Sequence, residues 1–319
     1  MRRSPVLAGL TSQRDRAQLR GKLDRRERQD APSTKDQLVA WLKATVSIQD
    51  VSEAETLDLT DFLRNSGKFE LSPEERLRQL AIFLEPDLLI PQPRGWLALD
   101  RIYQQALRYA PNSVSVHHSR ALSGKYCAEC LSPNGDATTY RRIMESAWYA
   151  ANTAYQIEST DADVLYLLGS LSYIDSTRTV NESLTFFDEA IGNDSNHQWA
   201  LLYRAHCLQD LERWADAAAA YDLVNPSYFV GPWVWRYELL LEQTAYCLLR
   251  SGGKEAALAQ FKRLLNRWNA NPELANGLMG IYITDAASGE LRGHLWDDLS
   301  ALVRRESLGW LPDAETERG

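Results

Sequence analysis

The residues best suited to chemistry are two closely spaced cysteines. Cys127 and Cys130 form a C-x2-C pair, and His117 and His118 precede them on the same predicted helix. Thiolates and imidazoles are the usual ligands of zinc, so this pair is half of a zinc site. The sequence has no second C-x2-C and no H-x3-H, and adjacent histidines point about 100° apart on a helix. We therefore predict no metal site, and we interpret the cysteines as two thiols at the end of a helix.

Motifs for catalysis and nucleotide binding are absent from the sequence. It contains no glycine-rich phosphate loop, no H-E-x-x-H and no G-x-S-x-G. The carboxylates are spread in the manner of charges on helix surfaces. We therefore predict no catalytic residue and no cofactor. Because many active sites have no local signature, an enzyme built on a helical frame stays open as one alternative.

A repeated pattern of helix positions runs through the centre and the C-terminal half of the chain. In five segments, a small or apolar residue is followed four residues later by an aromatic or apolar residue. Another small or apolar residue follows three residues after that. Steps of four and three keep residues on one face of an α-helix, so each set is a buried stripe. The five stripes are Leu99/Tyr103/Ala106, Ala147/Ala151/Ala154, Ser183/Phe187/Ala190, Ala217/Tyr221/Val224 and Ala257/Phe261/Leu264.

Each stripe stands at a fixed distance from a small residue in a neighbouring helix. The spacing is 22 residues from Leu99 to Ala121, from Ala147 to Gly169 and from Ser183 to Ala205, and 12 residues from Ala205 to Ala217 and from Ala245 to Ala257. Together these spacings give a unit of about 34 residues with two helices. The small residue marks the point where the two helices cross, because a larger side chain would push them apart.

This unit resembles the tetratricopeptide repeat. The family pattern of an apolar residue, Leu-Gly and an aromatic residue stands here as LYLLGSLSY (165–173), and ALLYRAHCL (200–208) is a second version. The resemblance covers residues 95–290 and is strongest over 147–265, with irregular spacing between units. It implies an all-α fold: a right-handed superhelical solenoid of antiparallel helical hairpins with an N-terminal helical extension.

The sequence divides into four parts. Residues 1–34 are a basic tail, disordered or loosely helical, and 35–90 are a small helical region or an N-terminal cap. Residues 91–292 are the solenoid, and 293–319 are a C-terminal capping helix and an acidic tail. Within these parts we expect helices at KDQLVAWLKA, at LTDFLRN, over about 73–84 and from near Gly95, with the prolines at 86, 91 and 93 breaking the chain between the last two. Further helices are expected at ELANGLMGIYI and HLWDDLSALVRRES.

Charge is distributed unevenly along the chain. The formal net charge is −8, but residues 1–35 hold ten Lys/Arg against four Asp/Glu, which leaves −14 on the remainder. Binding to nucleic acid needs clustered Lys/Arg, so the acidic body argues against it, and the alternative is that the basic tail binds RNA or DNA. Four cysteines, no secretory signal and no long apolar run predict a cytoplasmic location without a membrane partner.

The resemblance also implies a binding groove. In solenoids of this type, the first helix of each hairpin lines a concave face, and the exposed positions lie at fixed offsets from the small residue. At these offsets we expect a partner-binding groove of Tyr166, Tyr173, Trp199, His206, Gln209, Glu242, Tyr246 and Arg250. Trp199 and Tyr246 are expected to point outward. Such an aromatic face suits an extended or helical peptide.

A second candidate surface is the segment NPSYFVGPWVWRY (225–237), which occupies a six-residue excess between repeats. Its aromatic residues, Tyr228, Phe229, Trp233, Trp235 and Tyr237, are either an interaction patch or the filling between adjacent hairpins. The sequence as a whole predicts a non-catalytic scaffold or adaptor that binds a protein or peptide partner.

Overall fold

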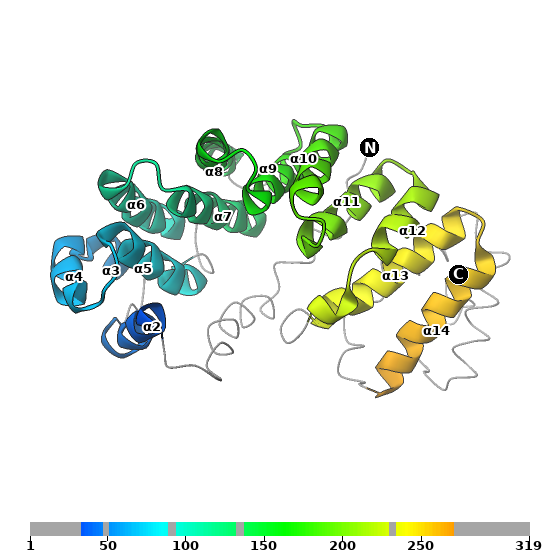
Figure 1. Cartoon of the computed structure of the whole chain (residues 1–319), viewed down its shortest axis with the longest axis horizontal. Helices are drawn as coiled ribbons and strands as arrows, with labels where there is room; N and C mark the ends of the chain where they lie inside the picture. Colours follow the sequence, from blue (N-terminus) through cyan, green and yellow to red (C-terminus); the bar gives the residue numbers. More distant parts are fainter. Residues whose placement is uncertain (1–32, 47–50, 89–93, 132–136, 230–233, 271–319) are drawn as a thin grey trace, which may run out of the picture. The chain divides into compact units, whose positions relative to one another are not determined.

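The chain is all-α over the residues that the computed structural model describes, which are 33–46, 51–88, 94–131, 137–229 and 234–270. These ranges form thirteen α-helices and two short 3-10 helices, without a strand (Figure 1). The α-helices are α2 (Thr34–Thr45), α3 (Val51–Thr56), α4 (Leu59–Asn65), α5 (Pro73–Leu88), α6 (Arg94–Tyr109), α7 (Val114–Cys130), α8 (Ala137–Ile157), α9 (Ala162–Ile174), α10 (Val180–Asn193), α11 (Gln198–Asp210), α12 (Trp214–Asp222), α13 (Val234–Arg250) and α14 (Lys254–Ala270). The 3-10 helices are η1 (Ser66–Lys68) and η2 (Pro226–Tyr228).

The described helices belong to two compact units that divide between His197 and Gln198. In the N-terminal unit, α5 packs against α6, α7 against α8 and α9 against α10, while α2, α3 and α4 pack against α5 or α6. In the C-terminal unit, α11 packs against α12 and α13 against α14. The helices therefore pack in consecutive pairs, which confirms the prediction of an all-helical chain built from two-helix elements.

The five predicted stripes are the buried faces of α6, α8, α10, α12 and α14. All fifteen of their side chains are buried, including Val224, which lies just beyond the end of α12. Ala121, Gly169, Ala205 and Ala245 are buried as well, on the facing helices. The spacing of small and aromatic residues thus identified the core positions correctly.

Two glycines show how closely the paired helices approach. A Cβ atom built on Gly169 of α9 would lie 2.6 Å from Cε1 of Phe187, which belongs to the stripe of α10. A Cβ atom on Gly124 of α7 would lie 2.8 Å from the Cβ of Ala147 in α8. Both distances are shorter than real Cβ contacts, so a side chain at Gly169 would displace the Phe187 ring, and one at Gly124 would displace Ala147.

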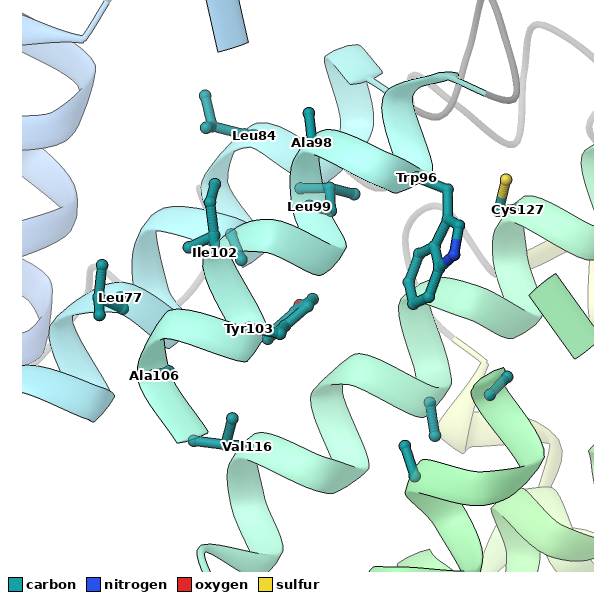
Figure 2. Close-up of a cluster of buried hydrophobic side chains, with 14 of the residues drawn as sticks. Leu77, Leu84, Trp96, Ala98, Leu99, Ile102, Tyr103, Ala106, Val116 and Cys127 are labelled. Carbon is teal, nitrogen blue, oxygen red and sulfur yellow. The ribbon is translucent and has the colours of Figure 1, made fainter. Parts of the chain in front are cut away.

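The core of the N-terminal unit continues from α5 through α6 to α7. Figure 2 shows Leu77 and Leu84 of α5 on one side of α6 and Val116 of α7 on the other. Among these apolar side chains, the hydroxyl oxygens of Tyr103 and Ser123 lie 2.9 Å apart, and Ser123 donates to the buried carboxylate of Glu85. This polar chain links the three helices and satisfies its buried groups.

The helix boundaries predicted from the sequence agree in part with those of the structure. The helices predicted at KDQLVAWLKA and LTDFLRN are α2 and α4, and α6 begins one residue before Gly95. The prediction that Pro86 breaks the chain is wrong, because α5 continues through it to Leu88. Pro86 has no N–H to donate to the carbonyl oxygen of Ile82, so it costs α5 a backbone hydrogen bond, but burial of Leu84, Pro86 and Leu88 holds the last turn in place.

Packing at the start of α6 is equally tight. A Cβ atom on Gly95 would lie 1.9 Å from the carbonyl oxygen of Leu88, so the first turn of α6 meets the backbone at the end of α5.

The polar helix α3 was not predicted. The helices expected at ELANGLMGIYI and HLWDDLSALVRRES, and the basic tail up to residue 32, lie outside the described residues.

Candidate functional site

The predicted thiol pair, Cys127 and Cys130, lies at the C-terminal end of α7. The Cys130 thiol is exposed, whereas Cys127 is buried, and burial raises the pKa of the Cys127 thiol to about 12. Cys127 is therefore protonated near neutral pH and is a poor nucleophile. Upstream, the Nε2 atom of buried His117 lies 2.8 Å from the carbonyl oxygen of Pro111. Within the described ranges, no group of three or more His, Cys, Asp or Glu side chains is arranged to hold a metal ion.

The eight predicted groove residues divide by burial. Arg250 is exposed, and Tyr166 and Trp199 are half-buried. The other five are buried: Tyr173, His206, Gln209, Glu242 and Tyr246. The prediction that these five side chains line an open groove is therefore wrong. Tyr246 was expected to point outward, yet it is only 7% exposed.

Side chains of the neighbouring helix α12 account for part of this burial. The Trp214 ring at the start of α12 lies edge to face with Tyr246, with ring centroids 5.7 Å apart. The Arg250 guanidinium lies 4.8 Å from the centroid of the same Trp214 ring. Further along α12, the Tyr221 hydroxyl lies 2.7 Å from Nδ1 of His206 and donates to Gln209 over 2.8 Å. The positions that regular repeats expose are here covered by bulky or polar partners.

Three aromatic rings meet at the beginning of the C-terminal unit, and we call Trp199, Tyr228 and Phe229 the aromatic corner. The Trp199 ring centroid lies 6.4 Å from that of Tyr228 and 5.6 Å from that of Phe229, both edge to face. Tyr228 and Phe229 are also edge to face, at 5.5 Å. Edge-to-face pairs at these distances are the favoured geometry of aromatic rings. The three rings therefore brace one another.

The aromatic corner joins an exposed ring to a buried one. Tyr228 is 50% exposed, whereas Phe229 is 2% exposed. Leu223, in the same connection between α12 and α13, is 63% exposed. The predicted patch is thus exposed at Tyr228 and buried at Phe229, while Trp233 and the side chain of Trp235 lie outside the described residues.

Local hydrogen bonds fix the connection that carries Tyr228. The side-chain oxygen of Asn225 accepts from the backbone N–H of Ser227 at 3.0 Å and from its hydroxyl at 2.7 Å. Pro226 sets the backbone at the start of η2, and the Asn225 N–H donates to the Gln198 side chain at 2.7 Å. The Asn-Pro dipeptide is a turn signal that could have located this segment from sequence.

A cation lies beneath the aromatic corner. The buried guanidinium of Arg236, on α13, is 5.1 Å from the centroid of the Trp199 ring. This distance is within the range of cation–π attraction. Sequence reasoning missed Arg236 and Leu223 because neither belongs to the repeat pattern.

No protein-family model matches the chain, and no curated protein matches it. Among the helices described, none is both long and apolar enough to cross a membrane.

Proposed function

We propose that this chain is a non-catalytic scaffold that binds a protein or peptide partner, and that Tyr228 of the aromatic corner is a principal contact. The observation that carries the proposal is that Tyr228 is half-exposed and lies on a connection between α12 and α13 that is held by hydrogen bonds and ring contacts. Tyrosine and tryptophan are the usual anchors of protein interfaces. An anchor that is already held in place loses little conformational entropy when a partner binds.

The helical pairs support the same proposal. Paired helices with small residues at their crossings are the building elements of tetratricopeptide-like solenoids, which act through extended binding surfaces. We extend this to a right-handed superhelical stack in a cytoplasmic protein. The five buried groove residues give no support to a groove along the first helices, so the contact surface moves to the aromatic corner.

Surface charge favours a protein partner over nucleic acid. The outer face of α10 exposes Glu182, Asp188 and Glu189, and this helix has no basic residue. Phosphate groups would be repelled from such a surface. A binding role for nucleic acid would fall to the basic residues of the tail, which the structure does not describe.

A capture experiment with matched variants tests the proposal. The full chain, Tyr228→Ser and Tyr149→Ser are used as baits, and the proteins that co-purify are quantified by mass spectrometry. Tyr149 is the control because its ring is 65% exposed, on α8 of the other unit. We expect a set of proteins bound by the wild type to fall about 5- to 30-fold with Tyr228→Ser, as for a loss of 1–2 kcal/mol.

The control must retain those proteins. If Tyr228→Ser captures the same proteins in the same amounts as the wild type, the aromatic corner is not the contact surface. If both variants lose them equally, the loss is nonspecific and the assignment to Tyr228 is wrong.

A further inference from the structure

A chain of buried polar groups links three helices of the C-terminal unit. His206 of α11 is 3% exposed, and its Nδ1 atom lies 2.7 Å from the Tyr221 hydroxyl of α12. Tyr221 donates to Oε1 of Gln209 at 2.8 Å. From α13, the Cys247 thiol donates to the same oxygen over 3.6 Å, and Nε2 of Gln243 is 3.3 Å from Nδ1 of His206. Burial raises the pKa of the Cys247 thiol to about 12, so it keeps its proton.

The contacts of the histidine ring involve only one of its two nitrogens. The Tyr221 hydroxyl oxygen and the Gln243 amide nitrogen both lie close to Nδ1, at 2.7 and 3.3 Å. The other nitrogen is Nε2, which carries an N–H whenever the ring is protonated. This atom is fully buried, and no group in the described part of the chain lies within hydrogen-bond distance of it.

Protonation would place an unsatisfied N–H at that atom. It would also place a positive charge on a ring that is only 3% exposed. A buried charge without a hydrogen-bond partner is strongly unfavourable. The folded unit therefore requires the neutral ring.

The groups that face His206 do not offset such a charge. Tyr221 faces it from α12, and Gln243 faces it from α13, and both are neutral near pH 7. The charged group that acts on the ring is Arg236 of α13, a cation. Burial, and secondarily the charge of Arg236, lower the pKa of His206 to about 3. His197 of the N-terminal unit differs, because its Nε2 lies 3.0 Å from the carboxylate of Asp163.

We propose that His206 makes the C-terminal unit sensitive to acid: the neutral ring holds α11, α12 and α13 together, and its protonation releases these helices from one another. The stabilisation is fully present above the ordinary pKa of 6.5, which applies to the unfolded chain, and it is lost as the pH falls from 6.5 toward 3. Between pH 7.5 and pH 5.0, these two pKa values give an increase of about 30-fold in the open-to-closed ratio.

Hydrogen exchange of the full chain, followed by mass spectrometry, measures this ratio. Rates at pH 7.5 and 5.0 are corrected for intrinsic exchange, and peptides from α11 to α13 are compared. In the wild type we expect protection of these peptides to fall about 30-fold at pH 5.0. In His206→Gln, which cannot titrate, the fall should be less than about 3-fold. The control His197→Gln, in the other unit, should behave as the wild type does.

A measurement on the wild type covers the case in which His206→Gln does not fold. Exchange of the C2 hydrogen of each imidazole with deuterium follows ring protonation and is read by mass spectrometry. The His206 peptide should show no titration between pH 5 and 8 in the native chain, and a midpoint near 6.5 in denaturant. A native midpoint above pH 5 would overturn the proposal. So would a wild-type loss of protection below about 3-fold, or a 30-fold loss that persists in folded His206→Gln.

Discussion

Gly169 and Gly192 allow the close helix crossing to be tested with one substitution in two places. Both glycines lie in the α9–α10 pair. A Cβ atom on Gly169 would lie 2.6, 2.8 and 3.0 Å from three carbons of the Phe187 ring, whereas one on Gly192 meets no atom within 4 Å. Alanine at Gly169 must therefore displace the ring, and alanine at Gly192 changes only the backbone preference.

The two effects have known sizes. An added methyl group in a packed core destabilises by about 1–3 kcal/mol. Replacement of glycine by alanine within a helix stabilises by about 0.5–1 kcal/mol. Phe187 is fully buried. We therefore expect Gly169→Ala to lower the free energy of unfolding by about 1–2 kcal/mol. Gly192→Ala should raise it by about 0.5 kcal/mol.

Urea denaturation followed by circular dichroism measures both changes. A third variant, Phe187→Leu, is combined with Gly169→Ala, because a smaller side chain leaves room for the added methyl group. The double variant should be less destabilised than the sum of the single variants by about 1 kcal/mol. If Gly169→Ala stabilises the chain as Gly192→Ala does, or if the two changes at the crossing are additive, the reasoning about the crossing is refuted.

Four further substitutions test other elements. Glu212, in the turn between α11 and α12, has a φ of 57°, and Gly252, at the same position in the turn after α13, has a φ of 90°. Such positive angles favour glycine, so in thermal unfolding Glu212→Gly should stabilise the chain by up to about 1 kcal/mol. Gly252→Ala should destabilise it by about 1–2 kcal/mol. Thr179→Ala removes the capping box of α10 and should lower the free energy of unfolding in urea by about 1 kcal/mol. Tyr173→Ala empties a site that is 2% exposed, so guanidinium unfolding should show a loss of about 3–5 kcal/mol, and a loss near zero would mean that the ring is on the surface.

The paired helices could be predicted because their pattern is local. Steps of four and three place Ala147, Ala151 and Ala154 on one face whatever lies around them, and all three are buried. The same holds for Gly169 and Phe187, whose types already indicate a narrow crossing and a large ring to fill it. Helix pairing therefore followed from residue size and spacing alone.

The candidate site could not be predicted in the same way, because exposure depends on what covers a residue. The offset of Tyr246 within its helix is unchanged, but Trp214 and Arg250 lie against its ring. The His206 side chain is buried, and it is hydrogen-bonded to the hydroxyl of Tyr221, which lies 15 residues further along the chain. The repeat pattern predicts which positions of a helix share one face, but it does not predict which side chains of the neighbouring helix cover that face. Pro86 shows the same limit, since tertiary packing overrides its local preference.

The cysteines of the native chain differ in exposure, so their labelling rates can be used to measure local opening of the structure. Cys130 is exposed, while Cys207 and Cys247 are buried on α11 and α13. A maleimide dye should therefore label Cys130 at once, and label the other two only as fast as the C-terminal unit opens. The pulse-labelling rate at Cys207 and Cys247 would then follow that opening without any substitution, with Cys130 as an internal standard for reagent strength.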